Sequence, residues 1–99
     1  MDKYGYPEDH ELRKIRNWEI KHPADAVALL EYIQDIWEFA DVGFYEIKNM
    51  EYRLSTGGWS GNEEIMNAIQ DNKVFWMLCW ESSKRGGHYW FKVELGFNE

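Results

Sequence analysis

Apolar residues in the first 42 positions recur at the spacing of amphipathic helices. Leu12 and Ile15 follow Pro7, which suits the start of a helix, and basic residues gather near the expected end of this segment. After Pro23, apolar residues recur at steps of four, three, four and three residues: Ala26, Leu30, Ile33, Trp37 and Ala40. Because an α-helix turns every 3.6 residues, these steps place the side chains on one face. The pattern predicts a short first helix and a second helix from residue 23 to about residues 41–43.

The pattern changes to alternation between residues 44 and 54, which is typical of a strand. The apolar phase slips near Lys48 and Asn49, and this slip predicts a bulge or a break. A turn-rich stretch at 55–62 then precedes a third helix of roughly ten residues, since Ser60 with Glu63 has the spacing of a capping box. Asn62 is an alternative cap for this helix.

A continuous apolar run at 74–80 predicts a central strand with cover on both faces. A turn at 82–87 leads to a final alternating strand. With Arg85 and Gly86 in the turn, Trp80 opposes Phe91, Leu78 opposes Val93 and Trp76 opposes Leu95. The other face of the hairpin would then carry Phe75, Met77, Cys79, Trp90 and Lys92. A second subunit could cover that face, so a homo-oligomer stays open.

Together these elements predict an α+β fold with the order α-α-β-α-β-β. One domain spans residues 1–99, in which an acidic helical part (1–42) precedes a β-α-β-β part (43–99). The connection at 56–73 is long enough for a right-handed crossover between neighbouring parallel strands. We therefore expect a three-stranded mixed sheet with one crossover helix.

A parallel arrangement would bring two unusual segments to one edge of the sheet, where open α/β sheets bind ligands. The glycine-rich segment would follow the first strand, and the hairpin turn would follow the second. The candidate binding residues are Thr56, Gly57, Gly58, Trp59, Ser60, Asn62, Arg85, His88 and Trp90. An antiparallel arrangement of these two strands would instead separate the segments. The glycines also have a purely structural interpretation, because tight turns need positive φ angles.

Acidic residues outnumber basic ones by 18 to 11, so the net charge of −7 argues against direct nucleic-acid binding. No Lys or Arg occurs between His22 and Ile47. Glu31, Asp35 and Glu38 are therefore expected on one anionic face. This face is either the solvated side of a helix or a surface that docks on a basic partner.

The sequence favours binding over catalysis. His10, His22 and His88 are isolated, and no Cys or His pair has the spacing of a zinc site, so we expect neither metal nor cofactor. The longest apolar run has about seven residues against about 20 for a membrane span, and no secretory signal is visible. A lone cysteine fits a reducing compartment, so we expect a cytoplasmic location.

Two motifs resemble those of small phage- and prophage-encoded proteins without assigned function. They are Thr-Gly-Gly-Trp-Ser-Gly-Asn-Glu at 56–63 and Arg-Gly-Gly-His-Tyr at 85–89. The resemblance implies an accessory protein in an infected bacterium that binds and inhibits a host protein such as a defence component. An alternative is a pocket that holds a nucleotide-like ligand between Trp59, Arg85 and His88. A second alternative is a small hydrolase that uses His88.

Overall fold

The computed structural model describes residues 2–48 and 50–94. Its helices are α1 (Asp9–Arg16), α2 (Pro23–Ile36), α3 (Ala40–Gly43), α4 (Ser60–Asp71) and α5 (Lys73–Cys79). Its strands are β1 (Phe44–Lys48), β2 (Glu51–Ser55), β3 (Trp80–Lys84) and β4 (His88–Lys92). The predicted α+β class is confirmed, as are the two N-terminal helices and a helix in the connection that follows β2.

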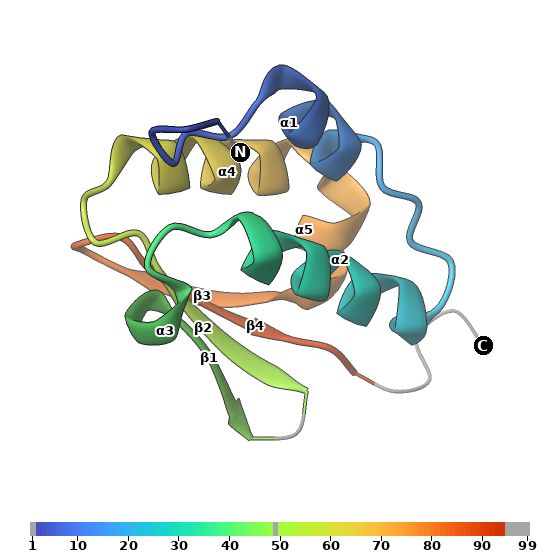
Figure 1. Ribbon diagram of the computed structural model, residues 1–99. Helices are drawn as coiled ribbons and strands as arrows, with labels where there is room; N and C mark the ends of the chain where they lie inside the picture. The colour runs from blue at the N-terminus through green and yellow to red at the C-terminus, as the bar shows by residue number, and fades with distance from the viewer. Residues whose placement is uncertain (1, 49, 95–99) are drawn as a thin grey trace.

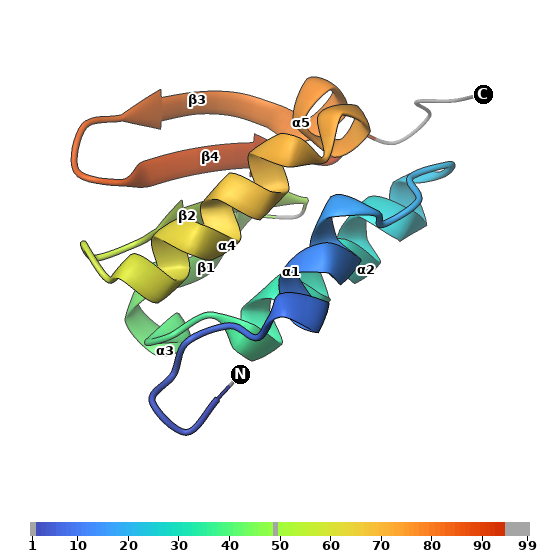
Figure 2. The same cartoon turned by 90° about the horizontal axis from the view of Figure 1, so that it is seen from above.

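The four strands form one sheet in the order β1-β2-β4-β3, and every neighbouring pair is antiparallel. The predicted three-stranded mixed sheet is therefore wrong in both strand number and direction of pairing. Helices α2 and α4 lie on one side of the sheet, and α1 lies beside them (Figures 1 and 2). The apolar core forms between these helices and strand residues such as Leu54 and Phe91, which are almost fully buried.

Residues 44–54 form a β-hairpin instead of the single strand that alternation predicted. Tyr45 pairs with Arg53, and the register shifts between Glu46 and Lys48. Met50 has a φ of 68° and lies in the turn, while Asn49 lies outside the described residues. The slip in the apolar phase therefore corresponds to a break between two strands, which was one of the two predicted alternatives.

Residues 73–79 form helix α5, so the prediction of a central strand at 74–80 is wrong. The side chain of Asn72 caps this helix, because its Oδ1 accepts a hydrogen bond of 3.1 Å from the backbone N–H of Phe75. Phe75 and Cys79 lie one helical turn apart and are buried, whereas Met77 is 77% exposed. An apolar run of this length fits either a strand or a helix, and the Asn72 cap at its start favours the helix.

The hairpin register is correct only where β3 exists. Trp80 pairs with Phe91 as predicted, but Leu78 belongs to α5 and cannot oppose Val93. The predicted partner Leu95 lies outside the described residues. Because Phe75, Met77 and Cys79 are helical, they do not line a sheet face with Trp90 and Lys92, and the apolar face proposed for a second subunit does not form.

Two helix boundaries also differ from the predictions. Helix α2 ends at Ile36, and the chain turns at Phe39 before the short helix α3. Helix α4 begins at Ser60 with Trp59 as its N-cap, and that end has no side-chain capping hydrogen bond. Ser60 and Asn62 are therefore helical residues and not caps. In the described part of the chain, no helix has the length and apolar character needed to cross a membrane.

Candidate functional site

The glycine-rich loop and the β3–β4 loop meet at one edge of the sheet, as the sequence predicted, but for a different reason. Strands β2 and β3 run in the same direction because both are antiparallel to β4, which lies between them. The start of β4 therefore lies beside the end of β2, where Ser55 pairs with His88. The N–H of Thr56 donates a 3.0 Å hydrogen bond to the carbonyl oxygen of Gly87 and joins the two loops (Figure 1).

Thr56 holds this junction together. Its side chain is buried, and its carbonyl oxygen accepts hydrogen bonds from the N–H of Trp59 (3.1 Å) and from Nδ2 of Asn62 (3.4 Å). Gly87 has a φ of +80°, and a Cβ there would collide with Oγ1 of Thr56. A close approach of two loops therefore requires glycine at position 87.

The side chains of Ser60 and Asn62 form hydrogen bonds within the protein. Asn62 is buried and makes two hydrogen bonds of 2.9 Å with the backbone of Glu38. Its Oδ1 accepts one from the N–H of Glu38, and its Nδ2 donates the other to the carbonyl oxygen of Glu38. These bonds attach the segment after α2 to the first turn of α4. Oγ of Ser60 lies 3.2 Å from the hydroxyl of Tyr6. We therefore interpret both residues as supports for the loop and not as contact residues.

A pocket of about 280 Å³ lies beside the glycine-rich loop, and we call it the Phe39 pocket. Its lining residues are Glu38, Phe39, Val42, Gly43, Ser55, Thr56, Gly57, Gly58 and Trp59. The loop residues and Glu38 were candidates from the sequence, whereas Phe39 and Val42 were not. The sequence had offered the acidic face and the glycine-rich loop as separate surfaces, and in this pocket Glu38 of the acidic face lies beside the loop.

Phe39 adopts an unusual backbone conformation for a bulky residue. Its φ of 59° and ψ of 42° are left-handed, a region that such side chains rarely occupy. Its side chain is nevertheless 61% exposed and forms an edge-to-face contact with Trp59 at a centroid distance of 6.5 Å. Neighbouring Val42 is 64% exposed. The chain thus keeps two large apolar side chains at the surface beside an open pocket.

Trp59 also lines the Phe39 pocket and is only partly buried. Its ring lies 4.9 Å from that of Tyr6, centroid to centroid. Its indole Nε1 is shielded from solvent and has no hydrogen-bond partner among the described residues. The absence of a side chain at Gly61 makes room for this ring, because a Cβ there would lie 2.7 Å from Nε1. The packing therefore fixes the indole and leaves its donor unused.

Gly57 and Gly58 determine the backbone conformation of the glycine-rich loop. Both have positive φ angles, of 64° and 73°. A Cβ at either position would meet no atom within 4 Å, so conformation and not crowding selects glycine here. The structural interpretation of these two glycines is therefore confirmed, although both also line the pocket.

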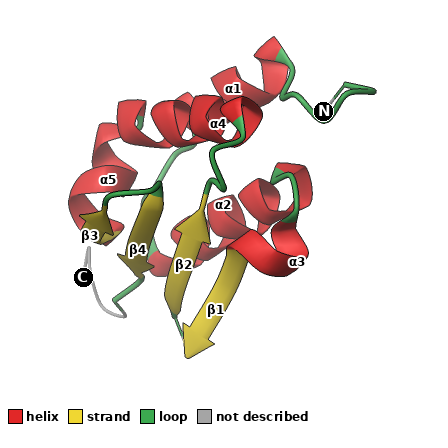
Figure 3. Cartoon of the chain, turned by 90° about the vertical axis from the view of Figure 1, so that its left-hand side faces the viewer, coloured by secondary structure: helices red, strands yellow, loops and turns green. Residues whose placement is uncertain are grey.

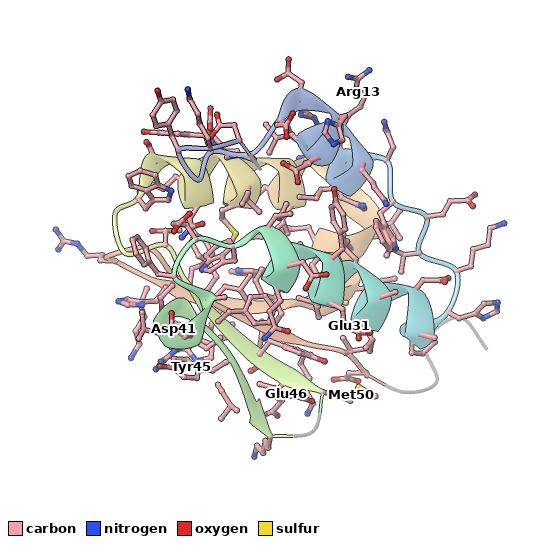
Figure 4. All side chains as sticks on the ribbon, in the orientation of Figure 1. Arg13, Glu31, Asp41, Tyr45, Glu46 and Met50 are labelled. Carbon is pink, nitrogen blue, oxygen red and sulfur yellow. The ribbon has the colours of Figure 1, made fainter. Side chains whose placement is uncertain are left out.

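The three residues of the predicted acidic face separate in the structure. Glu38 lines the Phe39 pocket, and Asp35 is exposed on α2. Glu31 lines a second pocket between α2 and the β1–β2 hairpin, where Figure 4 shows it near Glu46 and Met50. Burial raises the pKa of Tyr52 in that pocket, and the charges of Glu46 and Glu31 raise it further. Glu38 and Glu31 therefore lie in two different pockets and do not form one acidic surface.

Arg85, His88 and Trp90 do not line the Phe39 pocket. Arg85 is exposed in the β3–β4 loop, and Nδ1 of His88 lies 2.8 Å from Oγ of Ser55. Among the described residues, no hydrogen bond or ring contact joins these three residues to Trp59, and the pocket that Trp59 lines includes neither Arg85 nor His88. In the described ranges, no three His, Cys, Asp or Glu side chains converge as metal ligands.

Comparisons with known proteins add no relative. No protein-family model matches the chain, and no curated protein or solved structure is similar to it.

Proposed function

We propose that this protein binds a partner protein by accepting an apolar side chain of that partner in the Phe39 pocket. The observation that carries the proposal is the exposed pair Phe39 and Val42 beside an opening bordered by Trp59. Aromatic side chains next to a pocket are typical of the residues that contribute most to protein interfaces. The strained backbone at Phe39 supports the same conclusion, because strain of this kind clusters at functional sites.

The size of the pocket favours a side chain over a nucleotide. Its volume of about 280 Å³ falls just below the range of about 300–1,000 Å³ for small-molecule pockets. It suits one large apolar or aromatic residue. Glu38 in the wall places negative charge at the pocket, and Asp41 of α3 (Figure 4) adds a carboxylate next in sequence to the lining residue Val42, so a basic residue next to the anchor would add favourable electrostatics.

The biological setting of the proposal rests on the resemblance to phage and prophage proteins. We propose that the partner is a host protein, that binding inhibits it, and that the encounter takes place in the host cytoplasm. A component of a bacterial defence system fits this setting.

Short peptides test the pocket directly. The probes are acetylated, amidated Lys-Trp-Lys and Glu-Trp-Glu tripeptides, and the readout is the amide chemical shifts of ¹⁵N-labelled protein. We expect the lysine peptide to shift residues that line the pocket, and the glutamate peptide to bind several-fold more weakly. Shifts scattered over the surface, or equal binding of both peptides, would contradict the proposal.

Phe39→Gly separates binding from folding. Glycine relieves a left-handed conformation that costs other residues about 1–2 kcal/mol, and this gain offsets the lost contact with Trp59, worth about 0.5–1.5 kcal/mol. We expect nearly unchanged stability and no peptide binding. The matched control is Met77→Ala, which removes an exposed apolar side chain from α5 and should leave binding intact. Binding by Phe39→Gly at the wild-type level would refute the role of the pocket.

A further inference from the structure

The face of the sheet that points away from the helices carries its own pattern of side chains. Tyr52, Leu54 and Phe91 are buried beneath the helices, so alternate residues on the same strands face the other way. Strand register places Tyr45, Arg53, Trp90 and Ser82 in one row across the sheet, and Ser55, His88 and Lys84 in the next. Figure 3 shows the helices above and to one side of the strands. Among the described elements, no helix covers this open face.

Charge on the open face is opposite in sign to that of the whole chain. The strands contribute Lys48, Arg53, Lys84 and Lys92, and Arg85 adds a fifth cation in the adjoining loop. The carboxylate in these paired rows belongs to Glu51, which lies 3.6 Å from Lys92 and 3.7 Å from Lys48. Glu81 lies in the bulge of β3, outside the paired rows. The open face is therefore positive on a molecule whose net charge is −7.

Aromatic rings alternate with these cations. The guanidinium of Arg53 lies 4.8 Å from the centroid of the Tyr45 ring, and its Nε is shielded from solvent without a hydrogen-bond partner among the described residues. Nζ of Lys84 lies 5.8 Å from the centroid of Trp90, whose ring is also 6.3 Å from that of His88. Cations held against rings in this way keep their remaining donors available for an anion.

We propose that this open face binds single-stranded nucleic acid. Trp90 and Tyr45 provide ring surfaces for unstacked bases, and Lys84, Arg53 and Arg85 provide charge for the phosphates. Aromatic residues on an exposed antiparallel sheet, combined with a basic track, form the kind of platform that binds single strands with little dependence on sequence. A duplex keeps its bases stacked and offers only phosphates, so the aromatic rows favour single strands.

The net charge of −7 weakens this attraction without abolishing it. Between His22 and Ile47 the chain has acidic residues and no Lys or Arg, and helix α2 within this segment lies on the other side of the sheet. At physiological ionic strength, exposed charges more than about 8 Å apart are largely screened from each other. A phosphate at the open face therefore responds mainly to the cations next to it. The proposal does not depend on the Phe39 pocket.

Fluorescence anisotropy with labelled 12-nucleotide oligo-dT and oligo-rU tests the proposal over a series of salt concentrations. We expect binding that weakens as salt rises, and weaker binding of a 12-base-pair duplex. Lys84→Ala should reduce the slope of log K against log salt by about 0.7, the value for one lost phosphate contact on a single strand. Trp90→Ala should weaken binding about 5- to 150-fold, as expected for the loss of one stacked base.

Lys73→Ala is the matched control, because Lys73 is an exposed lysine at the start of α5 and not on the open face. It should leave both affinity and salt slope unchanged. Lys84→Glu changes an exposed side chain and keeps the test valid if Trp90→Ala unfolds. Absence of oligonucleotide binding, preference for the duplex, or equal effects of Lys73→Ala and Lys84→Ala would overturn the proposal. A concentration-dependent dimer, seen by sedimentation, that Lys84→Glu abolishes would also overturn it.

Phe39→Gly should bind oligonucleotides normally, so this proposal and the proposed peptide site can fail separately.

Discussion

At the scale of single residues, Asn72 connects three segments of the chain. Its Nδ2 donates hydrogen bonds to the carbonyl oxygens of Ile15 (2.9 Å) and Trp18 (3.0 Å), and its Oδ1 caps α5. The side chain is almost completely buried. It therefore satisfies backbone groups at the end of α1 while it starts the helix that replaces the expected strand.

Asn72→Ala should destabilise the protein by about 3 kcal/mol. The substitution leaves the carbonyl group of Trp18 and the N–H of Phe75 without the Asn72 partner, while the carbonyl group of Ile15 keeps a 3.3 Å hydrogen bond from the N–H of Trp18. Each buried polar group left unpaired costs about 1–3 kcal/mol, less where water can reach it. Urea denaturation measures the loss. Asn67→Ala, an exposed site on α4, should change stability by less than about 0.5 kcal/mol. Equal losses in the two variants would show that Asn72 has no special role.

Cys79 illustrates a residue whose surroundings suppress its chemistry. Burial raises the pKa of its thiol to about 12, so very little thiolate exists at neutral pH. We expect no reaction with iodoacetamide at pH 8 while the protein is folded, and prompt reaction in concentrated guanidinium chloride. Mass spectrometry distinguishes the two states. Fast alkylation of the folded protein would mean that the end of α5 opens readily.

At the scale of elements, periodicity predicted the helices better than the strands. Residues 23–36 have a clear helical period and form α2, and the third helix expected after the turn-rich stretch forms as α4. The run at 74–80 is apolar at nearly every position, so it carries no period by which to tell helix from strand. The deciding signal was the polar residue before it, Asn72, which could have been recognised as a cap.

The candidate site was predictable only in part. Thr56, Gly57, Gly58 and Trp59 belong to an unusual segment and do line the pocket. Phe39 gave no such signal, because it lies within the stretch predicted as helical up to residues 41–43, on the side away from the apolar face of that predicted helix. Its role depends on where α2 ends, and tertiary contacts such as the bonds between Asn62 and Glu38 contribute to that boundary.

The contact between the two loops gives a prediction for Gly87. Gly87→Ala should cost more stability than Gly58→Ala, because both introduce a side chain at positive φ but only residue 87 faces Thr56 at close range. The conformational cost alone is about 1–2 kcal/mol. Urea denaturation of both variants measures the difference. Equal stabilities would mean that the two loops separate without cost.

At the scale of the whole molecule, stability should fall in acid. Asp25 accepts hydrogen bonds from the backbone N–H groups of Lys21 and His22, and these lower the pKa of its carboxyl group from the ordinary value of 3.8. Burial alone would raise the pKa of Glu11, but a hydrogen bond from the N–H of Glu8, together with other favourable interactions, leaves it lowered from 4.5. A carboxyl group with a lowered pKa stabilises the fold above its unfolded pKa, and this stabilisation disappears as pH falls through the folded value.

Circular dichroism melts between pH 7 and pH 2.5 test this expectation. The melting temperature should change little down to about pH 5 and then decrease. Asp25→Asn should melt below the wild type at pH 7, and the difference should shrink toward the lowest pH because a growing fraction of the wild-type carboxyl is then protonated. A difference that stays constant across the whole range would contradict the assigned role of the Asp25 charge.

The strand order has a consequence for how the chain reaches its native state. Strand β4 occupies an inner position, yet it follows every other described helix and strand in the sequence. Until β4 is inserted, β2 and β3 both present open edges, and no earlier strand can close them. The β1–β2 hairpin and the helices can form locally, but the sheet must wait for a pairing between residues 51–55 and 88–92. Synthesis halted before His88 would therefore yield an aggregation-prone fragment, so the full fold is assembled only after translation has passed β4.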